Sequence, residues 1–182
     1  MININEIFYS LQGEGFWTGL PAVFVRLSGC NLKCDFCDTD HTSSTPMTEQ
    51  QIVDLVIKYP AKTVILTGGE PLMQPIGALV DLLHKAGKRI HIETNGTFKC
   101  PYPIDWITCS PKYKPVVLDR IDELKIVYQG QDVESIRKSC PETQHNFLQP
   151  CSGKNIESTI DYIKANPHWR LSLQTHKLIN IR

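Results

Sequence analysis

The sequence lacks the features that mark a membrane, secreted or nucleic-acid-binding protein. No apolar run approaches the roughly 20 residues that a membrane-spanning helix needs. The N-terminus has neither the basic start nor the apolar stretch of a secretory signal. The 19 basic residues balance the 19 acidic ones, so no excess charge favours nucleic acid or a membrane surface as a partner. We therefore expect a cytoplasmic protein with neither kind of partner.

The seven cysteines are an odd number, which fits a reducing compartment better than a disulfide framework. Three of them, Cys30, Cys34 and Cys37, form the motif C-x3-C-x2-C. A loop this short can turn all three sulfurs toward one inorganic centre. An iron–sulfur cluster that only carries electrons normally binds every iron through a thiolate. Three thiolates on a four-iron cluster leave one iron open, so the count favours a cluster that takes part in chemistry.

A zinc site is the alternative that the spacing leaves open. Structural zinc binds four Cys or His ligands, and His41 would complete such a set as C-x3-C-x2-C-x3-H. The chain would then be a zinc-binding module without catalysis.

Apolar strands alternate with helical segments along the chain, a pattern typical of a parallel sheet. The 182 residues suit a single domain, residues 1–182. About six crossover strands carry about three ordinary helices, so we expect an α/β fold, a reduced and partly open βα barrel. Helices are expected at 48–59 with Thr48 as N-cap, at 75–87 and at 155–166, with at most two helical turns at 133–139. Strands are expected within 4–9, 22–29, 62–71, 89–96, 106–110, 123–128, 146–150 and 171–176.

Polar residues and glycines follow nearly every expected strand. The carboxyl ends of barrel strands meet at one edge and hold the ligands of such folds. We therefore expect an active site built from residues 30–37, 67–70, 93–95, 110–112, 149–150 and 174–176.

Arg26 is the one charged residue in the apolar strand that leads into the cysteine motif. A buried arginine needs an anionic partner, either a protein carboxylate or a bound one. Its position directly before the cysteines favours a bound ligand.

Several motifs together carry a resemblance to a known family. The cysteine motif with Phe36 before its last cysteine, and GGEP at the end of the next strand, resemble the radical S-adenosylmethionine (SAM) superfamily. SLQGEG, VRLSGCNLKCDFCDT, LTGGEP, ETNGT, SPK, LQPC and LSLQTHK are more closely similar to the 7-carboxy-7-deazaguanine synthases, nearly from end to end. The resemblance implies a radical SAM type of barrel. It also implies a 4Fe–4S cluster whose fourth iron binds SAM and cleaves it to a 5′-deoxyadenosyl radical.

The resemblance implies a lyase that converts 6-carboxy-5,6,7,8-tetrahydropterin to 7-carboxy-7-deazaguanine with loss of ammonia, in queuosine and other deazapurine biosynthesis. It further implies Mg²⁺, a homodimer, and an electron donor such as flavodoxin or ferredoxin. Two readings remain beside it. One is an activating enzyme of the same superfamily that acts on a partner protein, and the other is the zinc module. The LQGEG loop, Arg26 and the short C-terminus favour a closed pocket for a small molecule over a groove for a peptide.

Matching motifs also imply roles for individual residues. Cys30, Cys34 and Cys37 would hold the cluster, and Thr39 would give Mg²⁺ a hydroxyl oxygen. Residues expected to bind SAM are Phe36, Asp38, Gly69, Glu70, Glu93, Ser110, Pro111, Lys112, Gln149, Pro150 and Cys151. Residues expected to bind substrate are Leu11, Gln12, Gly13, Glu14, Arg26, Thr67, His176 and Arg182, the last through the C-terminal carboxylate. His176 equally fits a structural role at the end of a strand.

Overall fold

A single nine-stranded sheet forms the frame of the molecule, for which a computed structural model describes residues 1–182. The strands are β1 (Ile2–Leu11), β2 (Pro21–Leu27), β3 (Thr45–Met47), β4 (Thr63–Gly68), β5 (Arg89–Thr94), β6 (Trp106–Cys109), β7 (Glu123–Tyr128), β8 (His145–Pro150) and β9 (Arg170–Leu171). The α-helices are α1 (Glu49–Val56), α2 (Gly77–Lys85), α3 (Val133–Lys138), α4 (Ile156–Ala165) and α5 (Thr175–Leu178). Two short 3-10 helices, η1 and η2, cover Pro71–Met73 and Cys151–Gly153.

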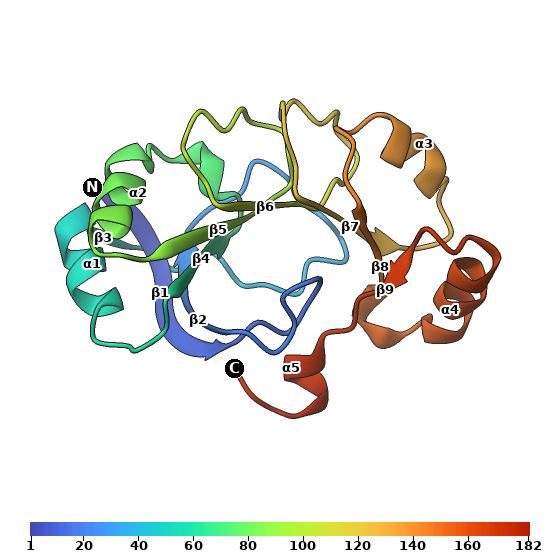
Figure 1. The fold of residues 1–182 in the computed structure, drawn as a ribbon, viewed down its shortest axis with the longest axis horizontal. Coiled ribbons are helices and arrows are strands. Elements are labelled where there is room, and N and C mark those ends of the chain that lie inside the picture. Colours follow the sequence, from blue (N-terminus) through green and yellow to red (C-terminus); the bar gives the residue numbers. More distant parts are fainter.

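The order of the strands in the sheet is β3-β1-β2-β4-β5-β6-β7-β8-β9. Strands β2 and β4 to β9 run parallel, whereas β1 pairs antiparallel with β2 and with β3. The sheet bends into an arch with α1 to α4 on its outer side, and α5 and the C-terminus lie beneath its open side (Figure 1). The expected α/β fold, a reduced and partly open barrel, is confirmed. None of the helices is long and apolar enough to cross a membrane.

The core lies between the outer face of the sheet and the helices. Strand β4 is rich in β-branched residues and its residues 64–66 are completely buried, as are Ile90 and Ile92 of β5. Helices α1 and α2 each turn one apolar stripe inward, with Ile52 and Leu79 among the buried side chains. Burying one such side chain stabilises the fold by about 1.5–3 kcal/mol. This packing fixes the strands and therefore the positions of their carboxyl ends.

The three expected main helices are confirmed as α1, α2 and α4, and the short segment 133–139 contains the brief helix α3. No helix connects β5 to β6 or β6 to β7, in line with the small number of helices predicted.

The expected strand at 171–176 is wrong. Strand β9 ends at Leu171, and residues 175–178 form helix α5 instead. The backbone N–H of Ser172 still donates to the Leu148 carbonyl at 2.9 Å, but the chain then turns away. The backbone N–H and the hydroxyl of Thr175 both donate to the Gly13 carbonyl at 2.9 Å. The hydrogen bonds to Gly13, in a distant loop, hold this segment out of the sheet although its alternating apolar residues are typical of a strand.

The N-cap of α1 gives a first prediction. The Thr48 hydroxyl accepts from the Gln51 backbone N–H at 3.2 Å, and the Gln51 side chain accepts from the Thr48 N–H at 2.8 Å. Thr48→Ala removes the first of these bonds and should lower the free energy of unfolding by about 1 kcal/mol. Urea denaturation measures the change. Ser44→Ala, an exposed residue without a side-chain hydrogen bond, should leave the midpoint unchanged. An equal effect in both variants would contradict the role of the cap.

Candidate active site

One large cavity opens at the carboxyl edge of the sheet. Its volume is about 1010 Å³, at the upper end of the range for small-molecule sites. Its walls come from the segments after β1, β2, β4, β5, β6 and β8, from strand β7 itself, and from the C-terminal segment. The convergence of strand ends expected from the sequence is therefore confirmed.

Nearly all of the residues predicted to have a role line this one cavity, although their individual roles stay predictions. Glu70 and Pro111 do not line it. The predicted residues at its wall are Leu11, Gln12, Gly13, Glu14, Arg26, Cys30, Cys34, Phe36, Cys37, Asp38, Thr39, Thr67, Gly69, Glu93, Ser110, Lys112, Gln149, Pro150, Cys151, His176 and Arg182.

Glu70 does not line the cavity and instead forms a buried junction, so its expected role in binding SAM stays a prediction. Its carboxylate accepts from the Thr94 hydroxyl and from the Asn95 backbone N–H, both at 2.7 Å, and from the Leu72 N–H at 3.0 Å. Its own backbone N–H donates to the Gly29 carbonyl at 2.9 Å. Burial raises the pKa of Glu70, and these protein donors work against that shift. The carboxylate thus accepts three hydrogen bonds from the protein, and the residue has no exposed surface.

Gly69 packs directly against the start of the cysteine loop. A Cβ atom at this position would lie 2.0 Å from the Gly29 carbonyl oxygen and 2.8 Å from the Cys30 Cβ. Only glycine permits this approach. The close contact places the backbone of the GGEP motif beside Cys30.

The three motif cysteines are free thiols at the cavity wall. The Tyr113 hydroxyl donates to the Lys33 carbonyl at 3.0 Å and accepts from the Lys33 backbone N–H at 3.1 Å, which holds the loop between the first two cysteines. Three unpaired thiols on a short loop that faces a cavity are a suitable donor set for a cluster with one open iron. His41 lines the same cavity, but no three His, Cys, Asp or Glu side chains lie close enough to hold a single metal ion.

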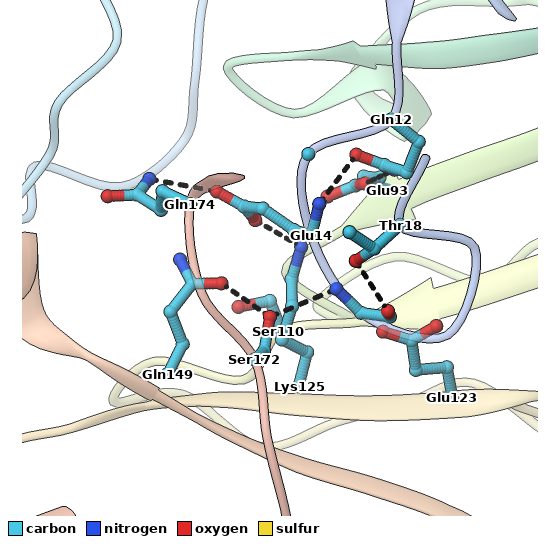
Figure 2. A network of polar contacts seen from close by, with 12 residues as sticks. Gln12, Glu14, Thr18, Glu93, Ser110, Glu123, Lys125, Gln149, Ser172 and Gln174 are labelled. Carbon is cyan, nitrogen blue, oxygen red and sulfur yellow. Dashed lines mark hydrogen bonds and ion pairs between the residues drawn. The ribbon is translucent and has the colours of Figure 1, made fainter. Parts of the chain in front are cut away.

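Lys125 is a central residue that the sequence did not identify as functional (Figure 2). Its ammonium forms ion pairs with Glu14 at 2.5 Å and with Glu93 at 3.0 Å. Burial alone would lower the pKa of Lys125, but Glu14, Glu93 and Glu123 raise it. Burial alone would raise the pKa of Glu14, but the charge of Lys125 holds it below its ordinary value. The feature of the sequence that could have identified Lys125 is its position as a charged residue in the middle of the apolar strand ELKIVY.

Two kinds of anionic partner were considered for Arg26, a protein carboxylate and a bound ligand. The structure shows a protein carboxylate. The Nε of Arg26 donates to Glu6 at 2.8 Å, and the two residues are cross-strand neighbours in β2 and β1. The guanidinium of Arg182 binds the other oxygen of Glu6 and lies over the Phe8 ring, 5.0 Å from its centroid. The Ser10 hydroxyl donates to the Arg182 carbonyl oxygen. These contacts hold the C-terminal residue beside Arg26 at the cavity wall.

The C-terminal segment links the cysteine loop to the loop after β1. The Gln174 amide donates to Glu14 and to Asp38, both at 2.8 Å. Lys177 donates to Asp38 at 2.5 Å. His176 packs against Gly13, where an added Cβ atom would lie 2.0 Å from its Nδ1, so both of its expected roles remain open.

Comparisons with known proteins point to one family. The model of the radical SAM superfamily matches residues 24–166. The chain is 60% identical to the 7-carboxy-7-deazaguanine synthase of Bacteroides thetaiotaomicron, with 100% of each chain covered. It is 40% identical to the enzyme of that name from Neisseria meningitidis serogroup B, over 98% of this chain and 93% of the relative. Among solved structures, QueE from Escherichia coli matches with a TM-score of 0.82 and 32% identity, over 96% of this chain and 94% of the other.

Glu123, which lies next to the Lys125 network, gives a prediction on pH. Its side chain is buried and accepts from the Phe16 backbone N–H at 3.2 Å. Burial raises the pKa of Glu123 from 4.5 to about 7. A carboxyl group with a raised pKa binds its proton more tightly in the folded state, so its contribution to stability falls as pH rises from 4.5 to about 7.

Glu123→Gln removes this titration and should gain stability relative to wild type as pH rises, by up to about 3 kcal/mol. Urea denaturation at about pH 4.5 and about pH 8 measures the difference. A difference between variant and wild type that does not change with pH would contradict the raised pKa.

Proposed function

Since this chain belongs to the 7-carboxy-7-deazaguanine synthase family of the radical SAM superfamily, we propose that it converts 6-carboxy-5,6,7,8-tetrahydropterin to 7-carboxy-7-deazaguanine with release of ammonia. It is a lyase of queuosine biosynthesis. The observation that carries the proposal is the single cavity, which is lined by the cysteine motif and by nearly every residue expected to bind SAM or substrate. No feature favours an activating enzyme over the synthase that the relatives are named for.

Family membership implies a 4Fe–4S cluster and SAM, which supply hydrogen-abstracting chemistry when they are bound. Cys30, Cys34 and Cys37 would hold the cluster. The Gly69 backbone lies beside Cys30, where it would meet the amino acid part of SAM. Residues from the ends of β6 and β8 would hold the rest of the cofactor, with Ser110 held in place by a hydrogen bond of 2.8 Å from Lys112.

The charged side chains divide the substrate side of the cavity into two parts. Arg26 and Arg182 share Glu6, which leaves an excess of positive side-chain charge for a substrate carboxylate. The sequence motifs imply that Glu93 binds SAM, but we reassign it to the substrate side because it shares Lys125 with Glu14. The two glutamates and one lysine leave an excess of negative charge for the N–H groups of a pterin. Leu11 to Glu14 and Thr67 line the same cavity and would complete the substrate site.

A magnesium ion would bind near Thr39, which follows the cysteine loop and lines the cavity. Mg²⁺ keeps several waters and needs few protein oxygens, so one hydroxyl group beside the substrate suits it. We further propose a homodimer in the cytoplasm, a flavodoxin or ferredoxin as electron donor, and one domain over residues 1–182.

An anaerobic assay tests the function. The reconstituted protein with SAM, a reductant, Mg²⁺ and the carboxytetrahydropterin should form the deazaguanine product and ammonia. Cys34→Ala should abolish both cluster binding and SAM cleavage because the cluster would lose one of its thiolates. Cys140→Ala changes a cysteine outside the cavity and should retain both. Iron content, visible absorption and product analysis report the outcome. A colourless wild-type protein that contains zinc and no iron would contradict the proposed function.

Thr39→Val tests the magnesium site. Losing the hydroxyl oxygen should raise the Mg²⁺ concentration needed for half-maximal product formation by about tenfold, equivalent to about 1.4 kcal/mol. Thr42→Val is the matched control because Thr42 binds Asp40 and does not line the cavity. Initial rates over a Mg²⁺ series give the comparison, and an unaltered magnesium dependence in Thr39→Val would remove this residue from the site.

A further inference from the structure

We infer that Lys125 is a positioning residue for the substrate, which holds the carboxylates of Glu14 and Glu93 so that both face the cavity and accept hydrogen bonds from N–H groups of the pterin ring. This inference rests on the proposed function, because it takes the ligand of this part of the cavity to be a pterin. Lys125 is argued to act through the two glutamates and not through direct contact with the reacting atoms.

Burial orders the three groups by depth. The side chain of Lys125 is 4% exposed, whereas those of Glu14 and Glu93 are 16% and 22% exposed. All three residues line the cavity. The ammonium therefore lies behind the carboxylates, and the carboxylates present the larger surface to a ligand. This arrangement fits a lysine that orients its partners.

Each carboxylate is fixed from two sides. Glu14 accepts from Lys125 through Oε2 and from Gln174 through Oε1. Glu93 accepts from Lys125 through Oε2 and from the Gln12 amide at 2.7 Å through Oε1. A carboxylate offers about four acceptor positions, so about two remain open on each glutamate. They can receive the N–H donors of a 2-amino-4-oxopyrimidine ring.

The positive charge has a second effect, which is to keep Glu14 ionised. The charged and titratable groups that act on Glu14 are Lys125 of β7, Lys112 after β6 and His176 of α5. Glu93 of β5 and Glu123 of β7 act on Lys125. Of these, Lys125 is the only one paired directly with the carboxylate. Without that partner, burial would raise the pKa of Glu14, and its neutral form has one acceptor oxygen fewer for the ligand.

Lys125→Met is the first test, in the anaerobically reconstituted enzyme. The Kd of the carboxytetrahydropterin, measured by titration calorimetry, should increase at least about tenfold at pH 7. The Kd should also fall as pH rises, because Glu14 then loses its proton. The wild type should show no such pH dependence.

Two further variants complete the experiment. Lys88→Met is the matched control, because Lys88 binds the carbonyls of Tyr59 and Ala61 outside the cavity and should keep the wild-type Kd. Lys125→Gln keeps N–H donors but lacks the charge, and it should show the same pH-dependent weakening even if the methionine variant does not fold.

A double-mutant cycle separates positioning from a general loss of structure. If Lys125 acts through Glu14, Lys125→Gln should weaken binding much less in a Glu14→Gln background than in wild type. Wild-type affinity and pH dependence in the Lys125 variants, or equal losses in both backgrounds, overturn the positioning role. A wild-type enzyme that neither binds nor converts the carboxytetrahydropterin contradicts the proposed function instead, so the two failures are distinct.

Discussion

The junction around Glu70 is the constraint on which the rest of the site depends. Its backbone is bonded to the Gly29 carbonyl at the end of β2, and its carboxylate is bonded to Thr94 and Asn95 at the end of β5. Asn95 in turn donates to the side chain of Asn31 in the cysteine loop at 3.0 Å. Three strand ends and the start of the cysteine loop are thus held in one network of hydrogen bonds. Buried hydrogen bonds of this kind fix positions because leaving a group unpaired costs about 1–3 kcal/mol.

Paired charges organise the cavity above this junction. One glutamate is shared by two arginines, and one lysine is shared by two glutamates. The two arginines leave an excess of positive side-chain charge, and the two glutamates leave an excess of negative charge. A small ring with a carboxylate at one end and N–H donors at the other is complementary to both. Much of the selectivity of the site can therefore arise before the chemical step, through preorganised charges.

The sequence predicted the general plan of the molecule but not its cross-barrel contacts. The motif of Cys30, Cys34 and Cys37 and the polar strand ends are local patterns, and parallel strands necessarily bring such ends together. The partners Glu6 and Lys125 were missed because their roles depend on residues far away in the chain. For Arg26, burial indicated an anionic partner, yet only the register of β1 and β2 identifies it as Glu6.

The wrong expectation for residues 171–176 has the same origin. The early end of β9 is set by a contact with a distant loop, which no local pattern reports.

The central claim is that the three cysteines hold a 4Fe–4S cluster with one iron open to SAM. Mössbauer spectroscopy of the anaerobic protein, reconstituted with iron-57, tests this most directly. The account predicts four irons per cluster, one of which changes its spectral parameters when SAM is added while the other three do not. Spectra that are unaffected by SAM, or a protein that binds no iron, would contradict it.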